Sequence, residues 1–313
     1  MPPPAADVST VLLPGPWQHR FVAANGARFH VAECGEGPLV LLLHGFPQFW
    51  WAWRHQLPAL ADAGFRAVAL DLRGYGASDK PPRGYDTATL AGDVAGVARA
   101  LGHSRAIVVG HDWGAWIAWS MPAYAPRLTQ AVAAVSMPHP LRMRAAWAAA
   151  GLREAPTRRV LPGLLAYQAP MLPERALVSG MQVERVLRGW SARPGYPDAE
   201  ELARYRGAMQ VPFVAHSALE YFRWSMRSVA RRDGRRFAER LRAPIGVPVL
   251  GLAGAEDPYV PPAAWAGCEA AVRAPWRLEV VPGAGHFLPE EAPDDVTDHL
   301  LRWLKGLPST PGR

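Results

Sequence analysis

The sequence predicts an α/β fold: a mostly parallel, eight-stranded sheet with helices on both faces and a helical cap inserted after the sixth strand. Apolar runs of buried-strand length alternate with helix-like segments, which is typical of a sheet covered on both sides. His44, Asp71 and Asp112 each follow such a run, and active groups gather at the carboxyl ends of parallel strands. A stretch of about 100 residues, rich in Arg and Trp and without a strand pattern, predicts the cap.

The strands are predicted by two kinds of signal. Asn25-Gly26 separates two β-like segments, and this dipeptide favours a tight hairpin turn. The later strands are near-continuous apolar runs that end at Gly or polar residues. In chain order the expected strands are Gln18–Ala24, Arg28–Glu33, Pro38–Leu43, Arg66–Asp71, Ala106–Val109, Gln130–Val135, Val247–Leu252 and Leu278–Val281.

Helical spacing of apolar residues predicts three helices between the early strands, at about 48–62, 87–101 and 116–124. The second begins at Asp86 or Thr87, either of which can cap a helix. Core strands resume after the strand-free stretch, so that stretch is an insertion rather than a separate linked domain. The expected divisions are a disordered tail at 1–16, a core at 17–138 and 242–306, a cap at 139–241, and a second tail at 307–313.

The composition indicates a soluble globular protein of ordinary type. The 313 residues are half hydrophobic and 19% charged, enough for a large core that needs no disulfides. Cys34 and Cys268 lack the spacing of metal ligands. The net charge of +7 comes from scattered arginines, and the basic run 231–236 is interrupted by an acid, so it indicates a solvated face. We expect a cytoplasmic protein with no nucleic-acid or membrane partner; a homodimer is compatible with the sequence.

The motif Gly110-His111-Asp112-Trp113-Gly114 carries the strongest functional signal. An apolar strand runs into a Gly-x-nucleophile-x-Gly turn that a helix-forming stretch follows, the pattern of a nucleophile elbow. Most such elbows carry Ser, and this one carries Asp. A carboxylate is already ionised at pH 7, so it can displace a leaving group from a saturated carbon and form an alkyl ester.

Hydrolysis of that ester needs a base, and the sequence offers His286. This residue lies in a Gly-rich loop after the last predicted strand, and Asp257 follows the strand before it. The order nucleophile, acid, His is the order of a triad on this kind of sheet. Asp257 would orient His286, which would deprotonate the attacking water. Glu256 is the rival acid, and Asp257 is favoured because it lies later in the loop.

Ester hydrolysis also passes through an oxyanion, which needs N–H donors. The candidates are the backbone amides of Phe46, in His44-Gly45-Phe46-Pro47, and of Trp113, which follows the nucleophile. The less favoured alternative is that His44-Gly45 is only a strand-ending turn.

Taken together, these motifs resemble the α/β-hydrolase fold, in the branch with an Asp nucleophile that holds epoxide hydrolases and haloalkane and haloacetate dehalogenases. The resemblance covers about residues 17–304 and includes the segment from Asp71 to Asp79, which is specific to the fold. Phe46 and Trp113 favour the epoxide hydrolases. The haloacetate enzymes often carry Arg after the nucleophile, and many dehalogenases carry Asn at the Phe46 position.

In similar epoxide hydrolases, two cap tyrosines donate to the epoxide oxygen. This chain departs from that pattern, because Gly163 and Phe222 stand where the family usually has them. Tyr221 is therefore the expected proton donor and Tyr167 a second one, while either ring could equally be a packed core aromatic. Substrate contacts are expected from His44, Pro47, Trp113, Phe222 and Phe287.

Three other readings remain open. One is a haloalkane dehalogenase that uses the same triad, with Trp113 and a cap residue such as Trp224 holding the halide. Another is an α/β-hydrolase of other specificity. The third is a receptor that binds a ligand without turnover, which the presence of nucleophile, acid and base together disfavours. No metal or organic cofactor is implied, since nucleophile and base are both side chains.

Overall fold

Residues 6–149 and 161–307 are described by the computed structural model, which contains one eight-stranded sheet in the order β1-β2-β4-β3-β5-β6-β7-β8. β1 and β2 form an antiparallel hairpin, β2 is antiparallel to β4, and every other neighbouring pair is parallel. The strands are β1 (Gln18–Ala24), β2 (Ala27–Cys34), β3 (Leu39–Leu43), β4 (Arg66–Leu70), β5 (Ala106–His111), β6 (Thr129–Val135), β7 (Val249–Gly254) and β8 (Trp276–Val281). The predicted fold class is thus confirmed.

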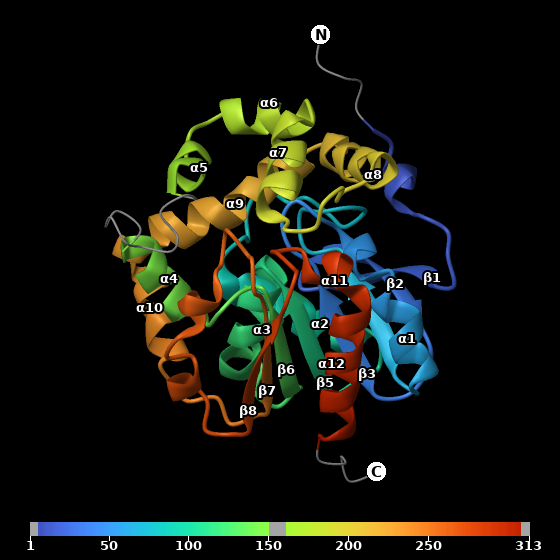
Figure 1. Ribbon diagram of the computed structural model, residues 1–313, viewed down its shortest axis with the longest axis vertical. Coiled ribbons are helices and arrows are strands. Elements are labelled where there is room, and N and C mark those ends of the chain that lie inside the picture. The colour runs from blue at the N-terminus through green and yellow to red at the C-terminus, as the bar shows by residue number, and fades with distance from the viewer. Residues whose placement is uncertain (1–5, 150–160, 308–313) are drawn as a thin grey trace.

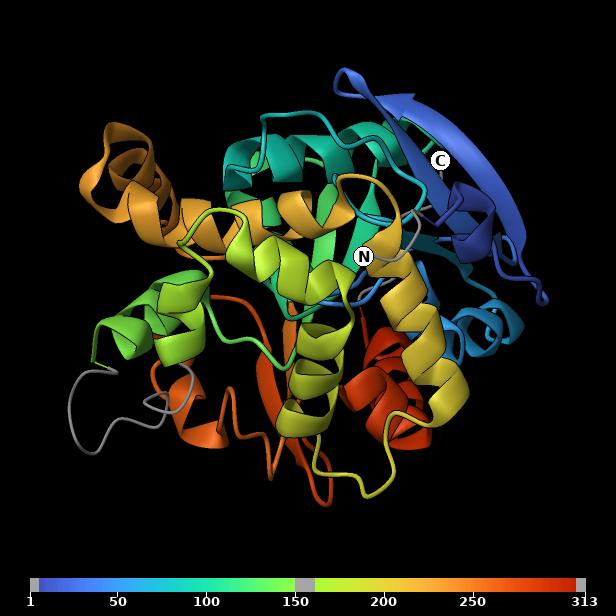
Figure 2. The ribbon, with the colours of Figure 1, turned by 90° about the horizontal axis from the view of Figure 1, so that it is seen from above.

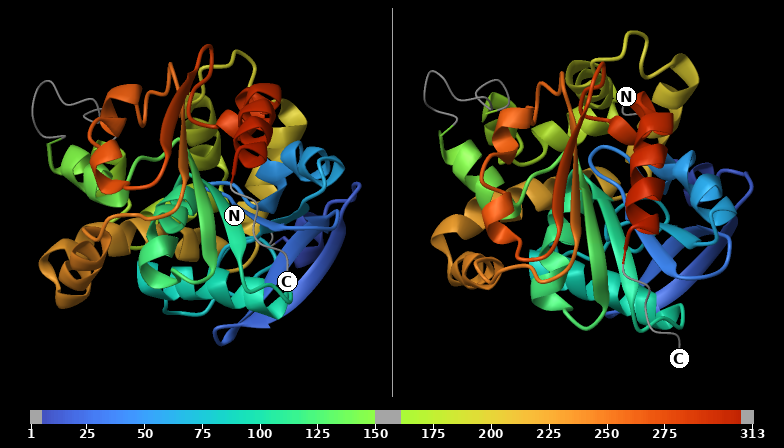
Figure 3. Two further views of the ribbon diagram at one scale, coloured as in Figure 1. Left: turned by 90° about the horizontal axis from the view of Figure 1, so that it is seen from below. Right: turned by 60° about the horizontal axis from the view of Figure 1, so that its bottom comes forward.

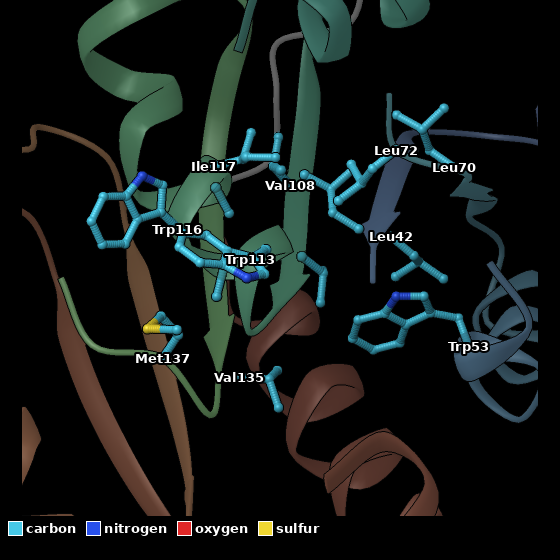
Figure 4. Close-up of a cluster of buried hydrophobic side chains, with 14 of the residues drawn as sticks. Leu42, Trp53, Leu70, Leu72, Val108, Trp113, Trp116, Ile117, Val135 and Met137 are labelled. Carbon is cyan, nitrogen blue, oxygen red and sulfur yellow. The ribbon is translucent and has the colours of Figure 1, made fainter. Parts of the chain in front are cut away.

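Helices cover both faces of this sheet (Figures 1 and 3). On one face α1 (Gln56–Asp62) packs on β4 and on α12 (Pro293–Lys305), which the short α11 (Leu288–Glu291) precedes. On the other, α2 (Thr87–Ala100) packs on α3 (Trp113–Tyr124), and α3 lies against β5 and β6. Figure 4 shows the resulting core, in which Trp116 and Ile117 of α3 lie beside strand residues such as Val108 and Val135.

Between β6 and β7 the described residues form helices and no strand. They are α4 (Pro140–Ala149), α5 (Leu161–Ala166), α6 (Leu172–Val178), α7 (Met181–Trp190), α8 (Ala199–Gln210), α9 (Val214–Arg227), η3 (Ser228–Ala230) and α10 (Arg232–Leu241). Seen from above, α5 to α9 lie over the ends of the strands, while α10 descends beside α3 (Figures 1 and 2). The helices above the sheet therefore cover the edge where the predicted catalytic side chains emerge.

Two expectations about local structure are wrong. The described part of the N-terminal segment is not a free tail: η1 (Val8–Val11) is capped by Asp7, and Val11 is buried, with its carbonyl accepting a hydrogen bond from Trp50 Nε1 at 2.8 Å. Residues 1–5 and 308–313 lie outside the described residues. The single helix expected at 48–62 is instead the 3₁₀ turn η2 (Trp50–Trp53) followed by α1, and Asp71 accepts the N–H of Trp50 at the start of η2 at 2.9 Å.

Among the described helices, none is both long enough and apolar enough to cross a membrane.

Candidate active site

Asp112 lies at a sharp turn between β5 and α3, with φ 50° and ψ −115°, and its side chain is fully buried. Positive φ is uncommon for a residue with a Cβ and stores about 1–3 kcal/mol of strain where the surroundings enforce it. Here they do, because the Asp112 N–H donates to the Val135 carbonyl and the Gly114 N–H donates to the His44 carbonyl. The carboxylate therefore sits at the N-terminus of α3, where the helix dipole stabilises negative charge.

Both glycines of the elbow are required by close backbone approach. A Cβ on Gly110 would lie 2.1 Å from the Gly114 carbonyl oxygen, and a Cβ on Gly114 would lie 2.1 Å from that of Leu43. These neighbours are backbone atoms of packed elements, so they cannot move aside as a flexible side chain would.

We expect Gly114→Ala to lower the free energy of unfolding by about 3 kcal/mol or more, as overpacking against rigid neighbours does. Urea denaturation followed by circular dichroism measures it. The matched control is Gly207→Ala in α8, where an added Cβ meets nothing within 4 Å; it should be neutral or stabilise by about 0.5–1 kcal/mol. Equal stabilities of the two variants would contradict this account of the elbow.

His286 and Asp257 face the nucleophile from the loops after β8 and β7. His286 Nδ1 hydrogen-bonds Asp257 Oδ2 at 2.8 Å, and His286 Nε2 lies 3.7 Å from Asp112 Oδ1. The other Asp257 oxygen accepts the amides of Tyr259 and Val260, at 2.8 Å each. The rival Glu256 is exposed. The structure thus brings Asp112, His286 and Asp257 together in the arrangement of nucleophile, base and orienting acid.

The charges around His286 oppose the effect of its burial. Burial lowers the pKa of the imidazole, but the Asp257 and Asp112 carboxylates outweigh that effect and raise the pKa to about 10. The raised pKa therefore favours the protonated imidazole between these two carboxylates. If Asp112 becomes a neutral ester, one of these anions is gone, and the pKa of His286 falls when a base is needed.

We expect the imidazole of His286 to titrate near pH 10 in the resting protein and about 1 unit or more lower in Asp112→Asn. Because the folded-state pKa exceeds the ordinary value of 6.5, the stability it contributes is full below pH 6.5 and is lost as the pH rises through about 10. Nitrogen-15 NMR of the imidazole measures the shift. Glu256→Gln, at an exposed carboxyl, should leave it in place; an unchanged pKa in Asp112→Asn would refute this account.

One predicted oxyanion donor already contacts the nucleophile. The Phe46 amide donates to Asp112 Oδ2 at 2.8 Å, and a Cβ on the preceding Gly45 would lie 2.4 Å from the Asp112 Cβ. The second predicted donor, the Trp113 amide, is the first N–H of α3. Helix-terminal amides of this kind lack an intrahelical acceptor, so they can stabilise an oxyanion.

Two predicted groups at strand ends serve the structure instead. His44 donates from Nδ1 to the Gly45 carbonyl at 2.9 Å and accepts the Leu72 amide at Nε2, so both ring nitrogens are occupied. Its expected contact with substrate is thus disfavoured. Asp71 is buried, pairs with His30 at 2.8 Å and accepts backbone amides.

Glu291, which the sequence analysis did not single out, holds the loop that carries His286, the predicted base; this loop (residues 282–287) is called the base loop below. Its carboxylate accepts the amides of Gly285 and Phe287 on either side of His286, at 2.9 and 2.8 Å. The same carboxylate accepts the amides of Ala192 and Arg193 at the end of α7. Glu291 therefore joins the base loop to the cap.

The neighbouring Glu290 forms a second buried link between core and cap. Its side chain bonds Gln48 and Arg54 of the core and the hydroxyls of Tyr196 and Tyr205 of the cap. The Tyr196 and Tyr205 distances are 2.7 and 2.6 Å.

Aromatic rings enclose the nucleophile from the cap side. Phe222 of α9 packs edge-on against Phe46 and Trp113, with ring centroids 5.1 and 4.9 Å apart, so it lies over both predicted oxyanion residues. Tyr167 contacts Phe46 and Phe222. Next to these aromatic rings is a mostly apolar cavity of about 630 Å³. Its wall includes Tyr167, Trp190 and Tyr259.

The two predicted proton donors differ in their freedom to act. The Tyr221 hydroxyl donates to the Arg73 carbonyl at 2.8 Å. Tyr167 accepts from Gln182 at 2.8 Å, and among the described residues no acceptor engages its own proton; the pKa of Tyr167 rises to about 12 through burial, with Asp112 contributing. The geometry therefore favours Tyr167 over Tyr221, the reverse of the sequence-based order.

The remaining predicted contacts lie close to the triad. Phe287 packs against His286 and His111 at 5.3 and 6.0 Å, so it supports the base. Pro47 is buried beside Phe46. The Trp224 indole, considered for halide, donates instead to Asp233 at 3.0 Å. In the described part of the chain no cluster of three or more His, Cys, Asp or Glu side chains could hold a metal.

Two further tyrosines near Asp112 escaped the sequence analysis. Tyr75 packs edge-on against His44, and Tyr259 packs edge-on against His286, at 4.8 and 5.0 Å. Both rings are buried, and both hydroxyls lack hydrogen-bonding partners among the described residues. The position of Tyr259, two residues after Asp257, was the signal that could have identified it.

The chain is similar to known proteins along most of its length. A family model described as alpha/beta hydrolase fold matches residues 38–293. Epoxide hydrolase A of Mycobacterium tuberculosis is 33% identical over 321 residues, covering 92% of this chain and 97% of its own. The Bacillus subtilis AB hydrolase superfamily protein YfhM is 33% identical over 294 residues, with 91% and 97% covered. The crystal structure of epoxide hydrolase A from Mycobacterium thermoresistibile is 30% identical, with a TM-score of 0.78 over 94% of this chain and 100% of that one.

Proposed function

Because this chain belongs to the α/β hydrolase fold family, on its epoxide hydrolase-like branch, we propose that it opens an epoxide to a vicinal diol through an alkyl ester on Asp112. The observation that carries the proposal is a buried carboxylate at a nucleophile elbow, held by the Phe46 amide at 2.8 Å and facing His286 at 3.7 Å. A carboxylate in this place can attack a saturated carbon without prior deprotonation.

The proposed reaction has two stages. In the first, Asp112 attacks an epoxide carbon while a hydroxyl group protonates the ring oxygen. In the second, His286, oriented by Asp257, deprotonates a water that attacks the ester carbon. The Phe46 and Trp113 amides stabilise the oxyanion that forms on Asp112 in this second stage.

The polar groups around Asp112 support an epoxide over other substrates. Opening an epoxide leaves an alkoxide, which needs a proton donor, and Tyr75, Tyr167 and Tyr259 all lie where the Asp112 charge raises the pKa of their hydroxyls. The apolar cavity beyond Tyr167 suits a hydrophobic substrate.

A haloalkane dehalogenase is the second candidate, and one observation favours it. The buried Trp113 indole N–H has no partner among the described residues, and an indole N–H can hold a departing halide. The proposed second halide donor, Trp224, is engaged with Asp233, which leaves this candidate weaker.

Parallel turnover of styrene oxide and 1-bromobutane separates the two activities. We expect diol from styrene oxide and no bromide release from 1-bromobutane. Bromide without diol would establish the dehalogenase instead, and no product from either would exclude both proposals for these substrates.

A further inference from the structure

The Tyr259 hydroxyl is the most conspicuous unused polar group near the site. Tyr259 is 0% exposed, and its hydroxyl has no hydrogen-bonding partner among the described residues. An unsatisfied buried polar group destabilises a protein by about 1–3 kcal/mol. A buried hydroxyl at a cavity wall that no described protein group engages is available to a molecule bound in that cavity.

Ring contacts fix the position of this side chain between the base and the cavity. Tyr259 stacks on Trp190 with centroids 3.9 Å apart and planes 2° apart, and its edge contact with His286 is 5.0 Å. The backbone N–H of Tyr259 donates to Asp257 Oδ1 at 2.8 Å, which holds the Tyr259 backbone beside the predicted acid. Tyr259 also lines the cavity on whose wall Tyr167 lies.

The Tyr259 hydroxyl lies where the Asp112 charge acts on it. Burial raises the pKa of Tyr259 well above its ordinary value, and the next largest contribution comes from Asp112, ahead of Tyr167 and Asp257. The raised pKa keeps this phenol protonated at neutral pH, the form that can donate.

The positions that would otherwise supply a donor are occupied by other groups. Gly163 has no side chain, Phe222 has no hydroxyl, and the Tyr221 hydroxyl is bound to the Arg73 carbonyl. Tyr167 on the cap and Tyr259 on the core are left as cavity-lining phenols. Of these two, Tyr259 contacts the triad directly.

We propose that Tyr259 is a catalytic residue that protonates the epoxide oxygen as Asp112 attacks; this inference rests on the proposed function. The Asp112 oxygen–carbon bond forms, the epoxide carbon–oxygen bond breaks with its electron pair on oxygen, and the Tyr259 proton moves to that oxygen. The phenolate forms as Asp112 loses its charge, so the site never holds both anions.

The second stage restores the phenol. The Tyr259 phenolate first takes the proton of the His286 imidazolium, which leaves a neutral imidazole. That imidazole carries one proton of the attacking water to the departing glycol oxygen, and the other proton, released as Asp112 returns to a carboxylate, restores the imidazolium. The sum of both stages is epoxide plus water to diol.

The test measures ring opening alone, in a His286→Gln parent that should accumulate the ester. With styrene oxide, adding Tyr259→Phe should slow adduct formation about 10²-fold or more, the usual contribution of a general acid. Adduct formation in the parent should be slower in D₂O than in H₂O. The double variant, which carries Tyr259→Phe as well as His286→Gln, should lose this difference. Its stability should be unchanged or higher, because Phe removes an unpaired hydroxyl.

The matched control is Tyr85→Phe in the same parent. Its hydroxyl bonds the Pro81 carbonyl and the Ser217 hydroxyl at 2.7 and 2.8 Å, so its loss should lower stability by about 1 kcal/mol without slowing the adduct. An unchanged adduct rate in Tyr259→Phe, or a loss found only in Tyr75→Phe, would overturn the assignment. A parent that forms no adduct would overturn the proposed function itself, and the assignment with it.

Discussion

Asp112→Ala is expected to lose epoxide hydrolysis by about 10⁴-fold or more, because removal of a covalent nucleophile eliminates the pathway rather than weakening one contact. The remaining donors, such as the Phe46 amide, still line the site, so substrate binding should change much less than turnover. A chromogenic epoxide assay measures the effect. Glu256→Gln, at the exposed carboxyl beside the triad acid, is the control and should retain wild-type turnover.

A single turnover in heavy-oxygen water gives an independent test of the same step. If the ester forms on Asp112, water attacks the carboxyl carbon, and the heavy oxygen appears in the Asp112 carboxylate rather than in the first diol released. Label entering that diol directly, or equal turnover by wild type and Asp112→Ala, would remove the covalent ester from the mechanism.

His286→Gln should stop the reaction after one ring opening per molecule, because the nucleophile remains while the base that activates water is gone. Intact-protein mass spectrometry should then show a stable increase equal to the mass of one epoxide. Steady-state diol production should fall by about 10³-fold or more, judging from losses in other triads.

The control for this variant is His216→Gln in α9, where the His216 side chain is 51% exposed. This control protein should turn over substrate without accumulating the adduct. Diol production at the wild-type rate by His286→Gln, or an adduct that disappears as quickly as in wild type, would show that another group activates the water.

Much of the fold follows from local sequence signals. β1, for example, has the predicted bounds because the turn at Asn25-Gly26 and the alternating strands around it act within a few residues. The N-terminal segment was misjudged for the opposite reason. Its Pro- and Ala-rich composition suggests a free tail, whereas the contact of Val11 with Trp50 spans 39 residues and cannot be read locally.

The candidate site divides in the same way. Asp112, Asp257 and His286 are predictable because each follows a strand, and the sheet brings the strand ends together. The partner of the Tyr221 hydroxyl is not predictable, since it is the Arg73 carbonyl 148 residues away. Neither is the role of Glu291, which depends on backbone amides of two separate loops. The strand pattern predicts which side chains meet, but tertiary packing sets the group that accepts each hydrogen bond.

The double attachment of Glu291 constrains how substrate can enter. The His286 amide also donates to the Trp190 carbonyl at 2.9 Å, so the C-terminal end of α7 and the base loop are fastened as one unit. If that end of the cap moved away from the core, it would displace the His286 imidazole and break its hydrogen bond with Asp257. If substrate is admitted by a movement of the cap, the part that moves should therefore be one other than this end of α7.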